Sequence, residues 1–173
     1  LDPTAGRLAS VIQDSNGKVT GIRTADGKSH TSSTTIIAAG GWTPTLVPSL
    51  DNLAETTAGS VIILKIPESS PLRKRFLPEN FPSYSFKMQD GAEGGIYGFP
   101  VDENGYLKIG YRGTKYTNPK VQSDGRERSQ PFTRWTEDER ITKIPEQALK
   151  VFRRFLDEYL PELRAEGIDI WLT

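Results

Sequence analysis

Apolar and polar residues alternate from residue 106 to residue 112, and this spacing predicts a β-strand, because successive side chains of a strand point to opposite faces. One face of the strand would carry Leu107, Ile109 and Tyr111. The other face would carry Tyr106, Lys108, Gly110 and Arg112. The first face suits a core, whereas the second places two cations beside a residue that has no side chain.

The segment before this strand predicts its partner. Residues 102–105 read Asp-Glu-Asn-Gly, and an Asn-Gly pair between two apolar runs is typical of a tight hairpin turn. The turn would set the strand antiparallel to residues 96–99. Tyr97 and Lys108 would then lie in one neighbourhood.

Short apolar runs near the N-terminal end predict a β-meander over residues 8–38, with turn signals at residues 14–17 and at Asp26-Gly27. Residues 34–39 are β-branched or small, which predicts a buried strand that ends at Gly40 and Gly41. Residues 45–56 have a loop-like composition.

The rest of the chain predicts a sheet and one long helix. Strands are expected at residues 61–66, 84–88 and 167–173, and a short helical turn at residues 72–76 within a proline-rich stretch. Residues 112–143 are polar and predict a long excursion that Trp135 could anchor. Residues 145–160 predict a helix with a single apolar stripe, made of Ala148, Phe152, Phe155, Leu156 and Tyr159. Together these elements predict an α+β fold, a mixed and mainly antiparallel sheet with one covering helix.

Composition limits the classes of function. The 173 residues include 22 basic and 22 acidic side chains, so nothing indicates the concentrated basic surface that nucleic acids require. The basic residues 73–75 and the pair Arg126 and Arg128 are expected to be solvated. No cysteine and a single histidine, His30, exclude a thiolate or histidine-rich metal site. No apolar run approaches membrane-spanning length.

Two interpretations of Lys108 stay open at this point. A lysine on an antiparallel strand usually points into solvent, and this is the more common case. A lysine beside a glycine on an otherwise apolar strand also suits a face that opens on a ligand, because glycine permits close approach to the backbone.

The segment Tyr97-Gly-Phe-Pro100, followed eight residues after the proline by Lys108 within Leu-Lys-Ile-Gly-Tyr-Arg, resembles a signature of the FAD-dependent amine oxidases. That group contains monomeric sarcosine oxidase, pipecolate oxidase and fructosyl amino acid oxidase, related to the D-amino-acid-oxidase-like flavoproteins. The resemblance implies that Lys108 lies over the flavin and assists the reaction with oxygen, with Tyr97 in the active site. Arg112 stands where the sarcosine enzymes have histidine, which leaves the substrate class open. Arg112 and Tyr106 are candidate substrate-binding residues.

The run Ile36-Ile-Ala-Ala-Gly-Gly-Trp42 resembles the strand that returns to the FAD domain in the same family. Cofactor-binding residues would then be Ala39, Gly40, Gly41 and Trp42, because small residues at a strand end allow a cofactor to come close. A plain strand followed by a turn is equally consistent with this run. On the family pattern, residues 1–45 would be part of a FAD-binding domain and residues 46–173 a truncated substrate domain.

The sequence contains no G-x-G-x-x-G loop, which in such flavoproteins cradles the pyrophosphate of FAD. The family carries that loop and a flavin-attaching cysteine outside the stretch that this sequence matches. We therefore expect an internal piece of a longer protein, which alone would be inactive and bind no FAD tightly.

The resemblance implies an oxidase that oxidises the C–N bond of a secondary amine by hydride transfer to FAD, and then passes the electrons to oxygen to give hydrogen peroxide. Sarcosine, pipecolate, saccharopine and fructosyl amino acids are all candidate substrates. Expected partners are the small amine, oxygen and the remainder of the same chain, with no nucleic acid, no metal and no membrane, in a cytoplasmic or peroxisomal setting. The alternative to an enzyme is that the chain is a non-catalytic, β-rich binding domain.

Overall fold

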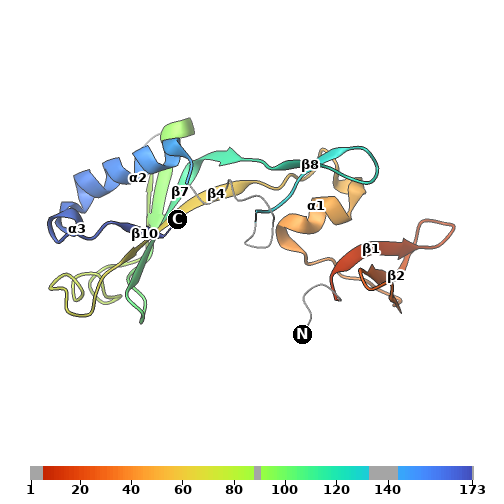
Figure 1. Cartoon of the computed structure of the whole chain (residues 1–173), viewed down its shortest axis with the longest axis horizontal. Coiled ribbons are helices and arrows are strands. Elements are labelled where there is room, and N and C mark those ends of the chain that lie inside the picture. The colour runs from red at the N-terminus through yellow and green to blue at the C-terminus, as the bar shows by residue number, and fades with distance from the viewer. Residues whose placement is uncertain (1–5, 88–90, 133–143, 173) are drawn as a thin grey trace. The chain divides into compact units, whose positions relative to one another are not determined.

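The computed structural model describes residues 6–87, 91–132 and 144–172, with side chains up to residue 170. Its contacts divide the chain into two compact units (Figure 1). The first comprises Leu1–Thr56 and Asn118–Pro131, and the second comprises Thr57–Thr117 and Phe132–Thr173. Among the described helices, none combines the length and the hydrophobicity needed to cross a membrane.

The first unit begins with an antiparallel three-stranded sheet in the order β1-β2-β3. Its strands are β1 (Leu8–Gln13), β2 (Val19–Thr24) and β3 (Ser29–Thr31). The predicted turns close both hairpins: the Asp14 carboxylate accepts hydrogen bonds from the amides of Asn16 and Lys18, and Gly27 has φ +83°. The predicted meander is therefore present over residues 8–31.

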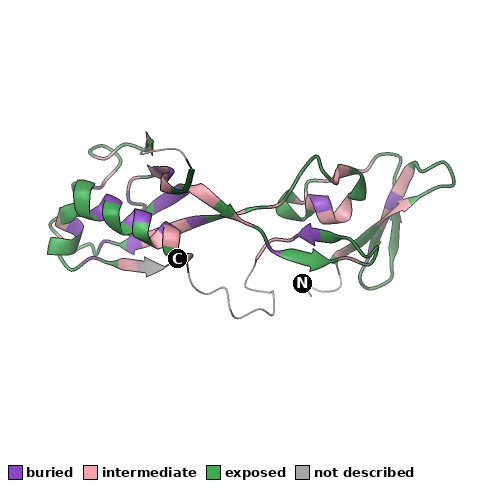
Figure 2. Ribbon diagram, turned by 90° about the horizontal axis from the view of Figure 1, so that it is seen from above, coloured by how far each residue is buried: buried purple, intermediate pink, exposed green. Residues whose placement is uncertain are grey.

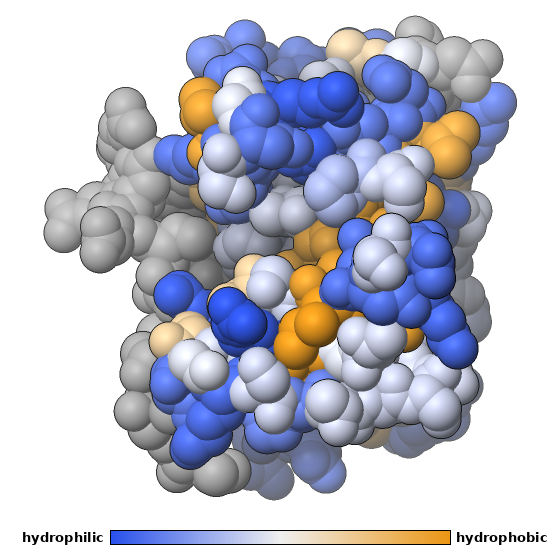
Figure 3. Space-filling view, turned by 90° about the vertical axis from the view of Figure 1, so that its right-hand side faces the viewer, coloured by the Kyte–Doolittle hydropathy of each residue, from blue (hydrophilic) through white to orange (hydrophobic). Residues whose placement is uncertain are grey.

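The predicted buried strand over residues 34–39 is wrong. These residues have no strand assignment, and Ile36 is 86% exposed. Figure 3 shows a face of the molecule on which apolar residues lie among hydrophilic ones. A β-branched sequence becomes a strand only when neighbouring strands satisfy its backbone groups, and no described strand pairs with this segment.

Short helices occupy the first part of the loop expected at residues 45–56, whereas residues 51–56 have no regular secondary structure. The 3₁₀ turn η1 (Gly40–Trp42) leads into α1 (Thr43–Leu46), and η2 (Pro48–Leu50) follows. Pro44 and Pro48 lie in the first turns, where a missing N–H costs nothing.

A further hairpin, β8 (Pro119–Val121) with β9 (Glu127–Ser129), completes the first unit. Residues 112–132 are thus not the unstructured excursion that their polar composition predicted, because residues 112–116 continue a long strand of the second unit. Gly125, with φ +77°, closes the β8–β9 turn. Trp135 lies outside the described residues.

The second unit contains an antiparallel five-stranded sheet in the order β10-β4-β7-β6-β5. Its strands are β4 (Ala58–Lys65), β5 (Tyr84–Lys87), β6 (Gly95–Gly98), β7 (Tyr106–Tyr116) and β10 (Ile170–Leu172). A 3₁₀ turn, η3 (Gly91–Glu93), precedes β6. Residues 72–76 form the short helical turn that was expected, in which the Phe76 amide donates hydrogen bonds to the carbonyls of Leu72 and Arg73, without extending into a regular helix.

Helix α2 (Glu146–Tyr159) covers one face of this sheet, and the short α3 (Pro161–Ala165) follows it (Figure 2). Pro145, expected in the first turn, is the N-cap of α2, and the helix begins one residue later than predicted. The apolar stripe is confirmed except at Tyr159, which is 42% exposed although its ring contacts Phe86. The predicted α+β class with a mainly antiparallel sheet and a covering helix is therefore correct.

All large apolar side chains that are buried in the described residues belong to this second unit. They form one cluster, which includes side chains of the sheet and of α2: Ile62, Leu64, Ile96, Leu107, Ile109, Tyr111, Phe152 and Leu156. The opposite face of the sheet carries none of them, and it is the face that bears the candidate site.

Candidate functional site

The predicted hairpin places the candidate residues on adjacent strands. β6 and β7 are antiparallel, with Tyr97 opposite Gly110 and Gly98 opposite Ile109. The Asp102 carboxylate accepts hydrogen bonds from the amides of Asn104 and Tyr106, which closes the turn. The Arg73 guanidinium donates to the carbonyls of residues 66, 102 and 103 and so braces the turn from outside.

The alternation along β7 sorts its side chains as the sequence predicted. Leu107, Ile109 and Tyr111 are at most 1% exposed and face the core, whereas Lys108 and Arg112 are exposed on the other side. We call that side the open face. Its cationic and aromatic side chains include Lys65, Tyr97, Phe99, Tyr106, Lys108 and Arg112.

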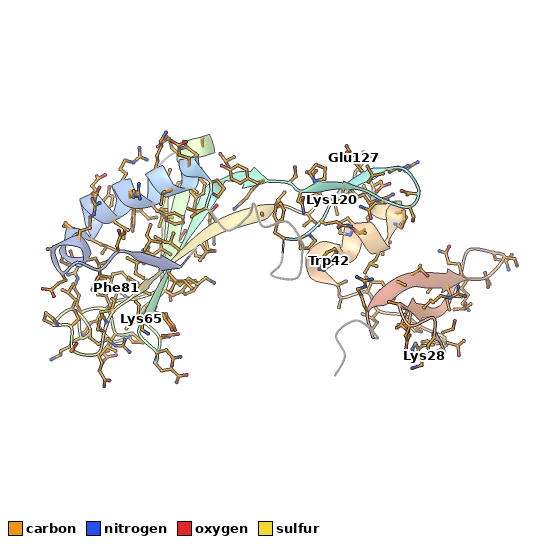
Figure 4. All side chains as sticks on the ribbon, in the orientation of Figure 1. Lys28, Trp42, Lys65, Phe81, Lys120 and Glu127 are labelled. Atoms are coloured by element: carbon orange, nitrogen blue, oxygen red, sulfur yellow. The ribbon has the colours of Figure 1, made fainter. Side chains whose placement is uncertain are left out.

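Three cations of the open face lie against aromatic rings. The Arg112 Cζ is 4.9 Å from the centre of the Tyr97 ring, and the Lys108 Nζ is 5.7 Å from that of Phe99. The Lys65 Nζ is 5.4 Å from the Tyr106 ring, and Figure 4 shows Lys65 at the end of β4. Such contacts stabilise a cation without neutralising it.

Gly110 sets the position of Tyr97. A Cβ at residue 110 would lie 2.1 Å from the Tyr97 Cζ, so the phenol ring occupies the space that a side chain would fill. The outer part of the Tyr97 ring therefore lies over Gly110 of β7, and the Arg112 guanidinium lies against this ring. The sequence identified Gly110 as a place of close approach, and the group that approaches is Tyr97.

The charged residues in four strands of this sheet are all basic. Strands β4, β5, β6 and β7 contain no Asp or Glu, yet they carry one basic residue in β4, one in β5 and three in β7. In the described part of the chain, neither Lys108 nor Arg112 forms an ion pair with a carboxylate, although both make the cation–aromatic contacts above. Such a face favours a ligand that is anionic or becomes negatively charged.

The four candidate residues of the second unit, two catalytic and two substrate-binding, are not all in contact with one another. Tyr97 contacts Arg112, and Phe99, whose role the sequence did not reveal, connects Tyr97 with Lys108 through a ring contact of 5.9 Å. Tyr106 and Arg112 are six residues apart on one strand, which is about 20 Å. A small ligand can therefore contact Tyr97 and Arg112 together, but not Tyr106 and Arg112.

The candidate cofactor residues of the first unit form a tight turn. Gly40 has φ +53°, and a Cβ there would meet nothing within 4 Å. Gly41 is packed: a Cβ would lie 2.9 Å from Pro131 and 3.0 Å from Thr56, whose hydroxyl donates a hydrogen bond to the Gly41 carbonyl. Trp42, labelled in Figure 4, is 36% exposed. The turn is thus packed against the protein at Gly41 and faces open space at Gly40.

Arg128 is not the solvated residue that the sequence suggested. Its side chain is only 5% exposed, and its guanidinium donates to both oxygens of Asp51, at 2.7 Å each, and to both of Asp124, at 2.8 and 3.0 Å. Arg126 also donates to Asp51, at 2.9 Å. Hydrogen bonds from Arg128 and then Arg126 lower the pKa of Asp51 to about 2. This cluster ties the β8–β9 hairpin to residue 51, 77 residues away, a pairing that no local pattern reveals.

A family model described as FAD dependent oxidoreductase matches residues 6–171. The chain therefore belongs to this family, which confirms the resemblance found in the sequence. No curated protein matches the sequence.

Several solved structures are similar to the chain. Fructosamine oxidase (Amadoriase II) from Aspergillus fumigatus is 27% identical, with a TM-score of 0.72 over 93% of this chain and 33% of its own. Amadoriase I from Aspergillus fumigatus, a fructosyl amine:oxygen oxidoreductase, is 25% identical, with a TM-score of 0.74 over 99% of this chain and 34% of its own. Fructosyl peptide oxidase from E. terrenum shares the fold, with 22% identity and a TM-score of 0.71 over 93% of this chain and 35% of its own. The chain spans about a third of the length of each.

Proposed function

We propose that this chain supplies part of a flavin-dependent amine oxidase that oxidises the C–N bond of a secondary amine or amino acid, with oxygen as acceptor and hydrogen peroxide as product. The observation that carries the proposal is the open face: an exposed ammonium at Lys108, without a carboxylate partner among the described residues, beside Tyr97 and Phe99. The family match and the amine-oxidising neighbours at 25–27% identity support the same class of reaction.

The residues present fit a flavin. The open face offers aromatic rings and positive charge without negative charge on β4–β7, and the turn at Gly40 has a side where a Cβ would meet nothing. Lys108 and Tyr97 are the proposed catalytic residues, and residues 39–42 the proposed cofactor-binding turn. FAD, when bound, would accept a hydride from the amine and pass two electrons to oxygen.

The chain's own residues would provide charge and orientation. The Lys108 ammonium would stabilise the negative charge that develops on oxygen as it takes up electrons, and a fixed charge is most effective where water is displaced. The Tyr97 ring, fixed by Gly110, would form one wall of the substrate site. Arg112 would hold a carboxylate through two parallel hydrogen bonds. The role of Tyr106 in substrate binding stays a prediction. Because Tyr106 lies far from Arg112, only a long substrate could contact both residues.

The test is a substrate screen with the full-length, flavin-containing protein. Anaerobic mixing with sarcosine, pipecolate, saccharopine and a fructosyl amino acid should bleach the flavin absorbance with at least one of them. Admission of oxygen should restore the absorbance and release one hydrogen peroxide per amine oxidised. If none of these amines reduces the flavin, amine oxidation is the wrong reaction for this protein.

A further inference from the structure

A hollow of about 280 Å³ lies on the open face beside Tyr97. It is lined by Ser85, Phe86, Lys87, Gly91, Gly94, Gly95 and Arg112. Two of these residues are cations and none is acidic. Three are glycines, which leave backbone exposed in the wall.

The wall formed by η3 is fixed to the rest of the second unit. The carbonyl of Ala92 accepts hydrogen bonds from the Tyr111 hydroxyl and, at 3.1 Å, from the Gln147 side chain. Arg154 of α2 forms an ion pair of 2.5 Å with Glu93. A Cβ at Gly94 would lie 2.5 Å from the backbone of Gly113, so this turn packs directly on β7. The side of the hollow next to η3 is therefore held in place by β7 and α2.

Arg112 is presented to this hollow in a defined orientation. Its guanidinium lies against the Tyr97 ring, which itself lies on Gly110, and it has no ion pair with a carboxylate in the part of the chain that the structure describes. A guanidinium that contacts an aromatic ring is not neutralised by it, so its N–H groups can still bind the two oxygens of a carboxylate.

We propose that this hollow binds a carboxylate of the substrate that is remote from the reacting C–N bond. This rests on the proposed function and narrows it: the preferred substrate is a secondary amine with an additional acidic group. The position of Arg112 next to Tyr97 carries the argument, because a ligand that contacts Tyr97 can reach the hollow, whereas a simple N-methyl amine would leave it empty.

The experiment compares two amines of nearly the same shape, N-methyl-L-glutamate and N-methyl-L-glutamine, in the full-length flavin-containing protein. The wild type should reduce its flavin with the glutamate derivative at a kcat/KM about 10- to 100-fold higher, the range expected for a charge-assisted pair. Arg112→Gln should lose most of that preference. Arg112→Lys, which keeps the charge, should retain part of it. Arg153→Gln, an exposed arginine of α2, is the matched control and should behave as the wild type.

A binding measurement separates this inference from the proposed function. Glutarate, titrated calorimetrically, should bind the wild type and Arg153→Gln at least tenfold more tightly than Arg112→Gln, whether or not any amine is oxidised. If amines are oxidised but glutarate binds wild type and Arg112→Gln equally, or binds neither, the inference is overturned while the oxidase function stands. If glutarate binds through Arg112 and no amine reduces the flavin, the hollow is a carboxylate site and the proposed reaction is wrong.

Discussion

At the scale of single residues, glycine and charge decide the geometry of the open face. Gly110 accepts the Tyr97 ring, and that ring in turn orients Arg112. The alternation along residues 106–112 predicted which side chains share this face, and the Asn104-Gly105 turn predicted which strand lies beside it. The contact of Phe99 with Lys108 was not predictable, because Phe99 follows the last residue of β6 and its direction depends on the local course of the chain.

Lys108→Met, in the full-length flavin-containing protein, should slow reoxidation of the reduced flavin by about a hundredfold or more while reduction by the amine changes far less. Methionine keeps most of the bulk of lysine, so the substitution tests the charge. Hydride transfer to the flavin delivers no negative charge to the place where oxygen reacts. Stopped-flow traces of the two half-reactions measure both rates. Equal losses in both, or no loss in the oxygen step, would exclude Lys108 as the oxygen-activating residue.

At the scale of elements, strands whose partners are near in sequence were predictable and those that need distant partners were not. β6 and β7 follow from one turn, as do β1 and β2. Residues 34–39 have the composition of a buried strand, but no described strand pairs with them. The β8–β9 hairpin was missed although Asp124-Gly125 is a turn signal, because the polar residues around it gave no apolar alternation.

The η3 turn offers a matched pair of substitutions that tests its packing on β7. Gly91 and Gly94 both have positive φ, +69° and +45°, but a Cβ at residue 91 meets nothing within 4 Å. Gly91→Ala should therefore lower the free energy of unfolding by about 1–2 kcal/mol, the cost of the left-handed conformation. Gly94→Ala should cost about 1–3 kcal/mol more, because its Cβ also meets the backbone of Gly113. Urea unfolding followed by circular dichroism measures both, and equal losses would show that the close approach at Gly94 is not rigid.

At the scale of the whole molecule, the chain spans about a third of the length of its structural neighbours and contains no G-x-G-x-x-G loop. We therefore expect that the 173-residue chain, expressed alone and purified with added FAD, retains no flavin absorbance and oxidises no amine. Fluorescence titration with FAD gives the affinity directly. A yellow protein with one FAD per chain would show that residues 39–42 and the open face suffice to hold the cofactor.

The two units differ in what stabilises them. The buried apolar cluster belongs to the second unit, whereas the buried residues described in the first include Thr24, Asn118, Arg128 and Ser129. The first unit therefore depends more on hydrogen bonds and on the pairs of Arg128 with Asp51 and Asp124. Hydrogen bonds from Arg128 lower the pKa values of both carboxylates, that of Asp51 to about 2.

This difference predicts selective acid sensitivity. A carboxyl group whose pKa is lowered by folding stabilises the protein above its unfolded value, near 4, and this contribution is lost as the pH falls from there towards 2. The urea midpoint of the first unit should thus fall between pH 4 and pH 2 more steeply than that of the second. Trp42 reports on the first unit if Trp135 and Trp171 are replaced by phenylalanine, since the chain has three tryptophans.

Asp51→Asn identifies the group responsible. In the variant that keeps only Trp42, this substitution should lower the urea midpoint at pH 6, because Arg128 loses a charged partner. The urea midpoint should also decrease less steeply below pH 4 than in the protein that keeps Asp51. The fall should persist in part, because hydrogen bonds also lower the pKa of Asp124 and of Asp26 in the same unit. Glu55→Gln, an exposed carboxylate of that unit, is the control and should leave the midpoint and its pH dependence unchanged. A midpoint that responds to pH equally in Asp51→Asn and the wild type would mean that the Arg128 cluster does not control the stability of the first unit.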